Sequence, residues 1–159
     1  MQQNTPELLV AVVRTLEAAQ IKTWLFGGWA EELSGLRPPG PHGDIDLLYP
    51  AATFAQLDTF LKASESVEEI KAKHFPHKRA FRWHHVLIEV FLLCPDANRY
   101  VTHFFGIHRF PWPEDTLSAS VPILGERMAC ASSRALTLYR RQHDVVAEAF
   151  DQYMSSQQL

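Results

Sequence analysis

The sequence predicts an α+β fold in which helices pack against one mixed β-sheet and two further helices close the chain. The 159 residues are 47% hydrophobic and 21% charged, which is typical of a globular protein long enough to bury a core. Helical patterns open and close the chain, and strand patterns alternate with short helices between them. Elements interleaved in this way favour one sheet covered by helices. We expect residues 1–159 to form a single domain.

The first half of the chain contains the clearest element signals. Apolar residues recur at helical spacing after Thr5-Pro6, and Pro-rich and Gly-rich sequence interrupts the pattern from residue 35 to residue 43. The elements expected here are a helix over 7–19, a strand over 22–26, a helical turn over 29–33, a loop over 35–43, a strand over 44–49 and a helix over 51–63.

The second half alternates short apolar runs with polar breaks before two helical patterns. The elements expected here are strands near 66–72, 78–83, 85–93 and 100–105, a turn rich in proline and aromatic residues over 110–115, and helices over 132–142 and 144–155.

Charge and composition exclude several classes of protein. A net charge of −3 argues against a protein that coats nucleic acid through bulk charge. Residues 1–6 lack the basic and apolar stretches of a signal peptide, and the apolar run Val86–Cys94 is too short to span a bilayer. Cys94 and Cys130 form no metal or redox motif and are interpreted as free thiols in a reducing compartment. We therefore expect a soluble, cytoplasmic protein without membrane partners.

A glycine pair follows the first expected strand. Gly27 and Gly28 stand between that strand and a helical turn, where the missing side chains let backbone N–H groups approach a phosphate closely. An ordinary turn remains the alternative for this pair taken alone.

Three acidic residues lie on strands. Asp44 and Asp46 alternate with Ile45, so both carboxylates project from one face, about 6–7 Å apart, and can share Mg²⁺ ions. Glu89 interrupts the apolar run from Val86 to Leu93, where a carboxylate is unfavourable without a partner. If the two strands are neighbours, the three carboxylates form one cluster; the alternatives are a solvated face for the aspartates and an edge strand for Glu89.

These features together resemble the DNA polymerase β-like nucleotidyltransferase superfamily. Gly27-Gly28-Trp29-Ala30, followed by Gly35, Arg37 and His42-Gly43-Asp44-Ile45-Asp46, is similar to the aminoglycoside and lincosamide nucleotidyltransferase branch. The resemblance covers residues 24–49, extends to Glu89 and fades afterwards.

The resemblance implies a role for each of these residues. Asp44 and Asp46 would bind two Mg²⁺ ions, and Glu89 would either complete the metal site or accept the proton of the acceptor hydroxyl. Gly27, Gly28 and Trp29 would lie at the phosphates of ATP or another nucleoside triphosphate, together with Arg37 and His42. For His42, a loop residue without contact to substrate is the alternative.

The sequence also departs from the branch. Glu32 stands where the branch has aspartate, and the loop Pro38–Pro41 lacks the basic residue that usually precedes the histidine, which leaves Arg37 as the nearest cation. Relatives often have aspartate in place of Glu89. These departures leave the substrate and the affinity for the triphosphate open.

Other residues offer weaker signals. The eight histidines of the chain show no zinc-ligand spacing, and adjacent strand residues such as His84 and His85 would point to opposite faces. Arg140 or Arg141 would be a phosphate contact by the same resemblance. Four aromatic residues would either stack on a substrate or fill the core, namely Phe104, Phe105, Phe110 and Trp112.

The predicted activity is Mg²⁺-dependent transfer of a nucleoside monophosphate, AMP from ATP, to a hydroxyl of a small molecule such as an aminoglycoside or lincosamide. One alternative is a catalytically inactive module that binds a nucleotide or a protein. Another is a toxin-type enzyme acting on protein or tRNA; the net charge disfavours tRNA, but a local basic group keeps it open, formed by Lys71, Lys73, Lys78, Arg79 and Arg82. Relatives that complete the acceptor site across a dimer suggest a homodimer.

Overall fold

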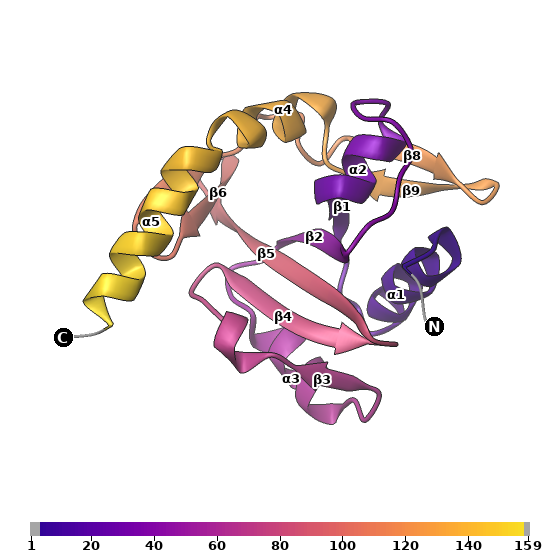
Figure 1. The fold of residues 1–159 in the computed structure, drawn as a ribbon, viewed down its shortest axis with the longest axis horizontal. Coiled ribbons are helices and arrows are strands. Elements are labelled where there is room, and N and C mark those ends of the chain that lie inside the picture. The colour runs from indigo at the N-terminus through magenta and orange to yellow at the C-terminus, as the bar shows by residue number, and fades with distance from the viewer. Residues whose placement is uncertain (1–3, 158–159) are drawn as a thin grey trace.

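A nine-stranded mixed sheet forms the centre of the protein (Figure 1). The computed structural model describes residues 4–157, so residues 1–3 of the segment considered for a signal peptide lie outside it. The predicted fold class is confirmed. The elements are α1 (Pro6–Ala18), β1 (Trp24–Phe26), α2 (Gly27–Leu33), β2 (Asp44–Pro50), α3 (Ala55–Ala63), β3 (Val67–Glu69), the 3-10 helix η1 (Lys71–Lys73), β4 (Lys78–Trp83), β5 (Val86–Asp96), β6 (Arg99–Phe104), β7 (His108–Pro111), β8 (Ala119–Ile123), β9 (Glu126–Cys130), α4 (Ser133–Arg141) and α5 (His143–Ser156).

The strand order places β2 and β5 side by side in the middle of the sheet. The order is β3-β4-β5-β2-β1-β9-β8, with β2 parallel to β5 and antiparallel to β1. The end of β5 leaves this arrangement and pairs with β6, which in turn pairs with β7. The two central strands are therefore the ones that carry Asp44, Asp46 and Glu89.

The two faces of the sheet have different coverings. On the face to which Ile45 and Tyr49 point, α3 packs through Phe54 against Tyr49, with ring centroids 6.3 Å apart. Gln56 of α3 donates hydrogen bonds to the carbonyls that end α1, those of Ala19 and Gln20. The two helices thus adjoin on the side away from the acidic residues. In Figure 1, α4 runs along the top of the molecule near α2, and α5 lies at the left, across the molecule from α1.

Local sequence explains where the helices begin. Thr5 caps α1 by accepting a hydrogen bond from the Leu8 N–H at 3.2 Å, with Pro6 at the first helical position. Ser132 caps α4 in the same way through the Ala135 N–H at 3.1 Å. The glycine pair does not form a separate turn, because Gly27 and Gly28 are the first two residues of α2.

Two expectations for the second half of the chain were wrong, and one pair of strands was not predicted. Residues 110 and 111 belong to β7 rather than to a turn, and the β8–β9 hairpin was not predicted at all. Its two-residue turn, Leu124-Gly125, has positive φ at both positions, as a tight hairpin with the usual strand twist requires. His84 and His85 also have positive φ and form the turn between β4 and β5, so they are not strand residues.

Two smaller expectations concern the thiols and the membrane. Cys94 and Cys130 are both free, with Cys130 buried and Cys94 half-buried. Within residues 4–157, no helix combines the length and the apolar character that crossing a bilayer requires.

Candidate active site

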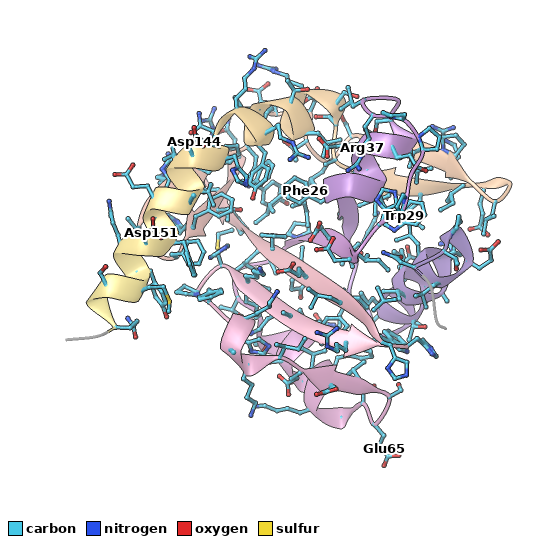
Figure 2. All side chains as sticks on the ribbon, in the orientation of Figure 1. Phe26, Trp29, Arg37, Glu65, Asp144 and Asp151 are labelled. Carbon is cyan, nitrogen blue, oxygen red and sulfur yellow. The ribbon has the colours of Figure 1, made fainter. Side chains whose placement is uncertain are left out.

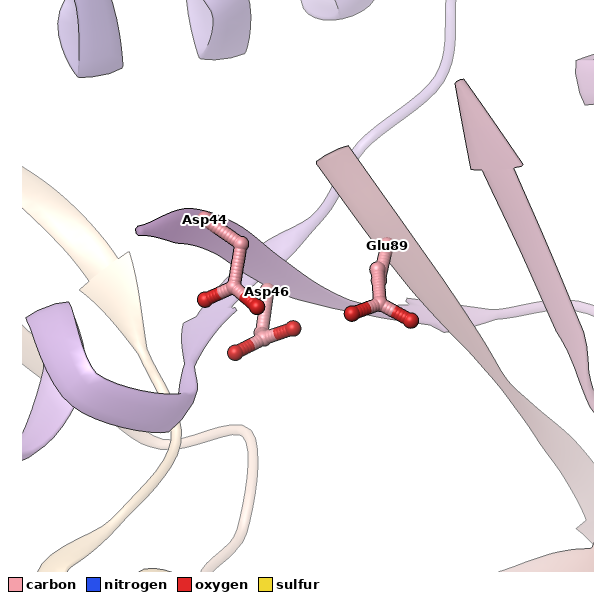
Figure 3. A group of neighbouring side chains, drawn as sticks. All are labelled: Asp44, Asp46 and Glu89. Atoms are coloured by element: carbon pink, nitrogen blue, oxygen red, sulfur yellow. The ribbon is translucent and has the colours of Figure 1, made fainter. Parts of the chain in front are cut away.

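The parallel register of the central strands brings three carboxylates together. Asp46 of β2 lies directly beside Glu89 of β5, and Asp44 projects from the same face two residues earlier because strand side chains alternate. One oxygen from each carboxylate lies within 4.8 Å of the others (Figure 3). It is the only group of three or more such ligand residues within the described part of the chain. The expected clustering is confirmed, and the histidines form no comparable group.

The cluster is electrostatically unfavourable without a cation. Burial, followed by the charge of Glu89, raises the pKa of Asp44. Burial, followed by the charges of Asp44 and Glu89, raises the pKa of Asp46 well above its usual range. Glu89 is 8% exposed and forms an ion pair with Lys78 of the neighbouring strand β4. Among the described residues, Lys78 is thus the one cation in an ion pair with this group of three carboxylates.

Gly27 brings the start of α2 into direct contact with the cluster. Its φ is +68°, and a Cβ atom there would lie 2.9 Å from Asp46 Cβ and closer still to one carboxylate oxygen. Only glycine fits this backbone conformation and this space. The backbone at the beginning of α2 consequently lies against Asp46.

A cleft of about 330 Å³ opens above the carboxylates. Gly27, Gly28 and the three acidic residues lie along one part of it, beside Lys78 and Arg140. Most of the remaining wall is apolar, namely Phe26, Phe91, Phe104, Phe105, Leu136, Tyr139 and Val146, and its polar members are Glu31, His77 and His143. Acidic and aromatic groups thus share one cavity that combines a charged floor with an apolar wall.

Three residues singled out from the sequence do not line this cleft. Trp29, which is labelled in Figure 2, is 5% exposed. It donates a hydrogen bond from Nε1 to Asn4 Oδ1 at 3.1 Å. The His42 ring packs against Trp29 in a tilted arrangement with ring centroids 4.1 Å apart, and its Nε2 is 2.8 Å from Glu32 Oε1. The Arg37 side chain is exposed and lies next to Gly28.

Glu32 organises the loop that precedes β2. Besides contacting His42, it accepts a hydrogen bond from the Gly40 N–H at 3.0 Å. The hydrogen bond with His42, more than any other contact, lowers the pKa of Glu32. The contacts of His42 with Trp29 and Glu32 hold the loop over residues 35–43 against α2. Because β2 begins at Asp44, directly after this loop, the same contacts position the start of β2.

The structure separates the remaining candidates. Arg140 lies at the cleft and forms an ion pair with Glu31, in which Nε is 3.2 Å from Oε2, whereas Arg141 lies outside this cleft. Phe104, Phe110 and Trp112 are buried, and among the four aromatic residues only Phe104 and Phe105 line the cleft. Core packing therefore accounts for Phe110 and Trp112.

Sequence reasoning missed several residues of the cleft as site residues, among them Lys78 and His77. From the sequence, Lys78 was predicted only as a member of a basic surface group, and no role was predicted for His77. Both residues line the cleft. His77 is 3% exposed, and its Nδ1 accepts a hydrogen bond from the Phe105 N–H at 2.9 Å. Burial, reinforced by the nearby Lys78 ammonium, lowers the pKa of His77 to about 3, so its imidazole is neutral.

The donor set of the cluster suits a divalent cation. The three groups supply only carboxylate oxygens, the ligands that Mg²⁺ prefers. Glu89 Oε2 is buried and, apart from its ion pair with Lys78, has no hydrogen-bond partner among the described residues. Burial and, after it, repulsion among the carboxylates raise the pKa values of Asp44 and Asp46, and a cation bound here would offset both.

Solved structures with the same fold are nucleotidyltransferases. The lincosamide antibiotic adenylyltransferase LnuA, in a lincomycin-bound structure, has 14% identity and a TM-score of 0.69, covering 87% of each chain. ANT(2'')-Ia in complex with adenylyl-2''-tobramycin has 15% identity and a TM-score of 0.65, covering 95% of this chain and 88% of that one. An antigenic nucleotidyltransferase-like protein from Paracoccidioides brasiliensis has 17% identity and a TM-score of 0.51, covering 94% and 75%.

The class of the protein follows from the fold together with a sequence family. No curated protein matches the sequence. The model of the family described as aminoglycoside-2''-adenylyltransferase matches residues 8–105, and the matched segment contains Gly27, the three carboxylates and Lys78. The protein is a nucleotidyltransferase. It belongs to the aminoglycoside-2''-adenylyltransferase family.

Proposed function

We propose that this protein transfers a nucleoside monophosphate, AMP from ATP, to a hydroxyl group of an antibiotic-like small molecule, with Mg²⁺ as the required ion. The observation that carries the proposal is the cluster of Asp44, Asp46 and Glu89 at the floor of a cleft, directly against the glycine that opens α2. Membership of an adenylyltransferase family supports the choice of ATP.

The proposed roles follow the placement of the residues. Asp44, Asp46 and Glu89 would hold Mg²⁺, which when bound neutralises charge on the phosphates. The backbone at Gly27 and Gly28, which have no side chains to obstruct it, would lie along the triphosphate. The acceptor hydroxyl oxygen forms a bond to the α-phosphorus, the bond from that phosphorus to the bridging oxygen breaks, and pyrophosphate leaves. The hydroxyl proton passes to a carboxylate of the cluster.

The cleft wall favours an acceptor with an apolar face. In this proposal Asp44 and Asp46 are occupied by Mg²⁺. The other two carboxylates of the cleft form ion pairs, Glu31 with Arg140 and Glu89 with Lys78, while Phe91, Phe104 and Phe105 present aromatic surface. A polycation would need unpaired carboxylates for its ammonium groups. Among the antibiotics bound in the similar structures, lincomycin in LnuA and adenylylated tobramycin in ANT(2'')-Ia, we therefore propose lincosamide-like acceptors before aminoglycosides.

The basic group considered for RNA binding is divided between the two faces of the sheet. Lys78 pairs with Glu89 inside the cleft, and Arg79 pairs with Asp58 on the other face. Two members of the group are thus neutralised and cannot add to one continuous surface for a phosphate backbone. A small acceptor fits these charges better than tRNA does.

A product assay tests the proposal. The purified protein would be incubated with Mg²⁺, each of ATP, GTP, CTP and UTP, and either lincomycin or tobramycin, with pyrophosphate release and acceptor mass measured together. We expect pyrophosphate only when an acceptor is present and a mass increase of one adenylyl group on the acceptor. Asp44→Asn is the matched inactive control. Nucleotide binding without any product, across all four nucleotides, would favour the inactive binding module.

A further inference from the structure

Lys78 occupies the position in the active site where a cation is needed. Its ammonium forms an ion pair with Glu89 Oε2, and the two side chains are 17% and 10% exposed. The ammonium also lies 5.6 Å from the centre of the Phe91 ring. A lysine held this closely inside a cleft differs from a solvated surface cation, because part of its hydration has been replaced by these contacts.

The sheet register makes this contact a fixed feature of the fold. In the β4–β5 pair, Ala80 lies opposite Glu89 and Lys78 lies opposite Phe91. Lys78 and Glu89 are therefore diagonal neighbours on one face, within reach of a long side chain. Ala80 has only a methyl group, so nothing bulky separates the ammonium from the carboxylate.

Other cations near the cluster are placed differently. Lys73 acts on Asp44 and Asp46 only through its charge and is exposed, and Arg140 is held by Glu31. Among the described residues, only Lys78 forms a salt bridge with one of the three carboxylates. One ammonium group thus faces three carboxylates, so the cluster and Lys78 together carry a net negative charge when all four groups are ionised.

We propose that Lys78 is a built-in counter-ion that competes with the divalent metal for Glu89, so that the metal binds tightly only together with a nucleotide. In the free enzyme the ammonium offsets part of the repulsion among the carboxylates. A metal ion that binds alone must displace the Lys78 ammonium from Glu89 without replacing that contact. A metal ion bound to a polyphosphate brings phosphate oxygens with it, and the released ammonium can form an ion pair with them. By linkage, the nucleotide and the metal then raise each other's affinity by one common factor. The inference rests on the proposed function of this site.

Manganese binding to the whole protein, with and without a nucleotide, tests the inference. Free Mn²⁺ would be followed by electron paramagnetic resonance in wild type, Lys78→Met and Lys78→Gln, with a non-hydrolysable ATP analogue as the nucleotide. We expect the wild type to bind Mn²⁺ weakly alone and at least about tenfold more tightly with the nucleotide. In Lys78→Met and Lys78→Gln, binding without the nucleotide should strengthen about five- to tenfold and the nucleotide effect should shrink.

Two further variants separate a direct contact from general charge. Lys73→Met removes a nearby exposed cation and should change Mn²⁺ affinity less than twofold, since its charge is screened by solvent. Lys78→Arg keeps the cation and should behave like the wild type. If Lys78→Met is too unstable to purify, Lys78→Gln, which can still donate a hydrogen bond to Glu89, provides the measurement.

The outcomes keep the two proposals apart. Unchanged or weaker Mn²⁺ binding by Lys78→Met and Lys78→Gln, in a wild type that binds Mn²⁺ with the nucleotide, overturns the counter-ion role and leaves the proposed function intact. A wild type that binds no Mn²⁺ even with the nucleotide contradicts the proposed function itself. Equal strengthening by Lys73→Met and Lys78→Met would show that total charge, rather than the contact with Glu89, sets the affinity, and would also overturn the inference.

Discussion

Two neighbouring residues of β4 form ion pairs on opposite faces of the sheet, and the pairs differ in kind. Lys78 faces Glu89 in the cleft, and Arg79 faces Asp58 of α3 behind it. Arg79 donates to both oxygens of Asp58, at 2.8 and 3.2 Å, and to the carbonyls of Phe75 and Lys78. Its guanidinium also lies 4.4 Å from the centre of the Phe54 ring.

The difference lies in the charge balance around each pair. On the α3 face, one cation meets one carboxylate and the guanidinium donates four hydrogen bonds, so the pair is complete. On the cleft face, one cation meets a cluster of three carboxylates, two of which have raised pKa values. An arrangement that keeps excess charge buried is unfavourable for folding by itself. The excess negative charge on the cleft face therefore indicates a face that binds a cationic ligand. The balanced Arg79–Asp58 pair on the other face indicates a contact that stabilises the fold.

The same substitution on the two faces gives the largest predicted contrast. Asp46→Asn should lower turnover at least about 100-fold, more than the usual loss for a residue that only supports a metal ligand. Its unfolding free energy in EDTA should not fall, since one of three repelling carboxylates becomes neutral. Product formation and urea unfolding, measured on one preparation, check both expectations.

The matched control on the other face is Asp58→Asn. It should keep turnover within about twofold and lose about 1–2 kcal/mol of stability, because Arg79 then lacks its charged partner. If the two variants showed the same pattern, both active or both merely unstable, the distinction between the faces would be wrong.

Gly27 gives the next largest effect. Gly27→Ala would have to adopt a φ of +68° and would press its Cβ against Asp46, so it should reduce stability by about 1–3 kcal/mol and turnover about tenfold or more through the displaced carboxylate. Thermal unfolding and the product assay measure the two effects.

Gly35 is the control for backbone conformation alone. It has a similar φ of +77°, but an added Cβ would meet no atom within 4 Å. Gly35→Ala should therefore be destabilised about 1–2 kcal/mol by its φ and keep its turnover. Equal losses of turnover in both variants would mean that contact with Asp46 is not what matters at Gly27.

From the sequence alone, the three carboxylates of the cluster could be predicted, but the lysine that pairs with Glu89 could not. Alternation along residues 44–46 places both aspartates on one face, and a carboxylate inside an apolar run signals a buried partner, so the cluster could be predicted from Asp44, Asp46 and Glu89. Lys78 was missed because its position depends on the pairing of β4 with β5. Recognising His84-His85 as a tight turn would have fixed that register and placed Lys78 diagonally across from Glu89.

Other differences arise from contacts that sequence spacing does not reveal. His42 lies two residues from Asp44, yet Glu32 and Trp29 hold its ring away from the cleft. The β8–β9 hairpin is built from two five-residue strands, one of them with Pro122 inside it, so its strand pattern is weak, and β9 joins the rest of the sheet through the pairing of Cys130 with Leu25 of β1. Turn chemistry at Leu124-Gly125 was the available signal.

A conservative substitution of Arg79 tests the Arg79–Asp58 ion pair with a smaller expected effect. Arg79→Lys keeps the charge but loses the planar fork that contacts both oxygens of Asp58 and the stacking on Phe54. We expect a loss of about 1 kcal/mol in urea unfolding with unchanged Mn²⁺ and nucleotide binding. A change in metal affinity as large as that expected for Lys78→Met would show that the two faces are coupled.

Two groups of the cleft should make stability depend on pH in opposite directions. His77 has an ordinary pKa of 6.5 when unfolded and a pKa of about 3 in the folded protein. Between these values the folded state binds fewer protons than the unfolded state, so this group makes stability fall as pH is lowered from about 6.5 toward 3. Asp46 acts in the opposite direction, because its raised pKa makes the folded state bind more protons above pH 3.8.

Urea unfolding in EDTA at several pH values between 4 and 7 separates the two contributions. His77→Asn, whose side-chain oxygen can still accept from the Phe105 N–H, should lose less stability on acidification than the wild type. Asp46→Asn should lose more, because the protonation that favours its folded state is gone. The double variant should lie between them. A His77→Asn variant with the wild-type pH dependence would show that the pKa of His77 is the same in the folded and unfolded protein, and burial would then not keep the imbalance of protons that this prediction requires.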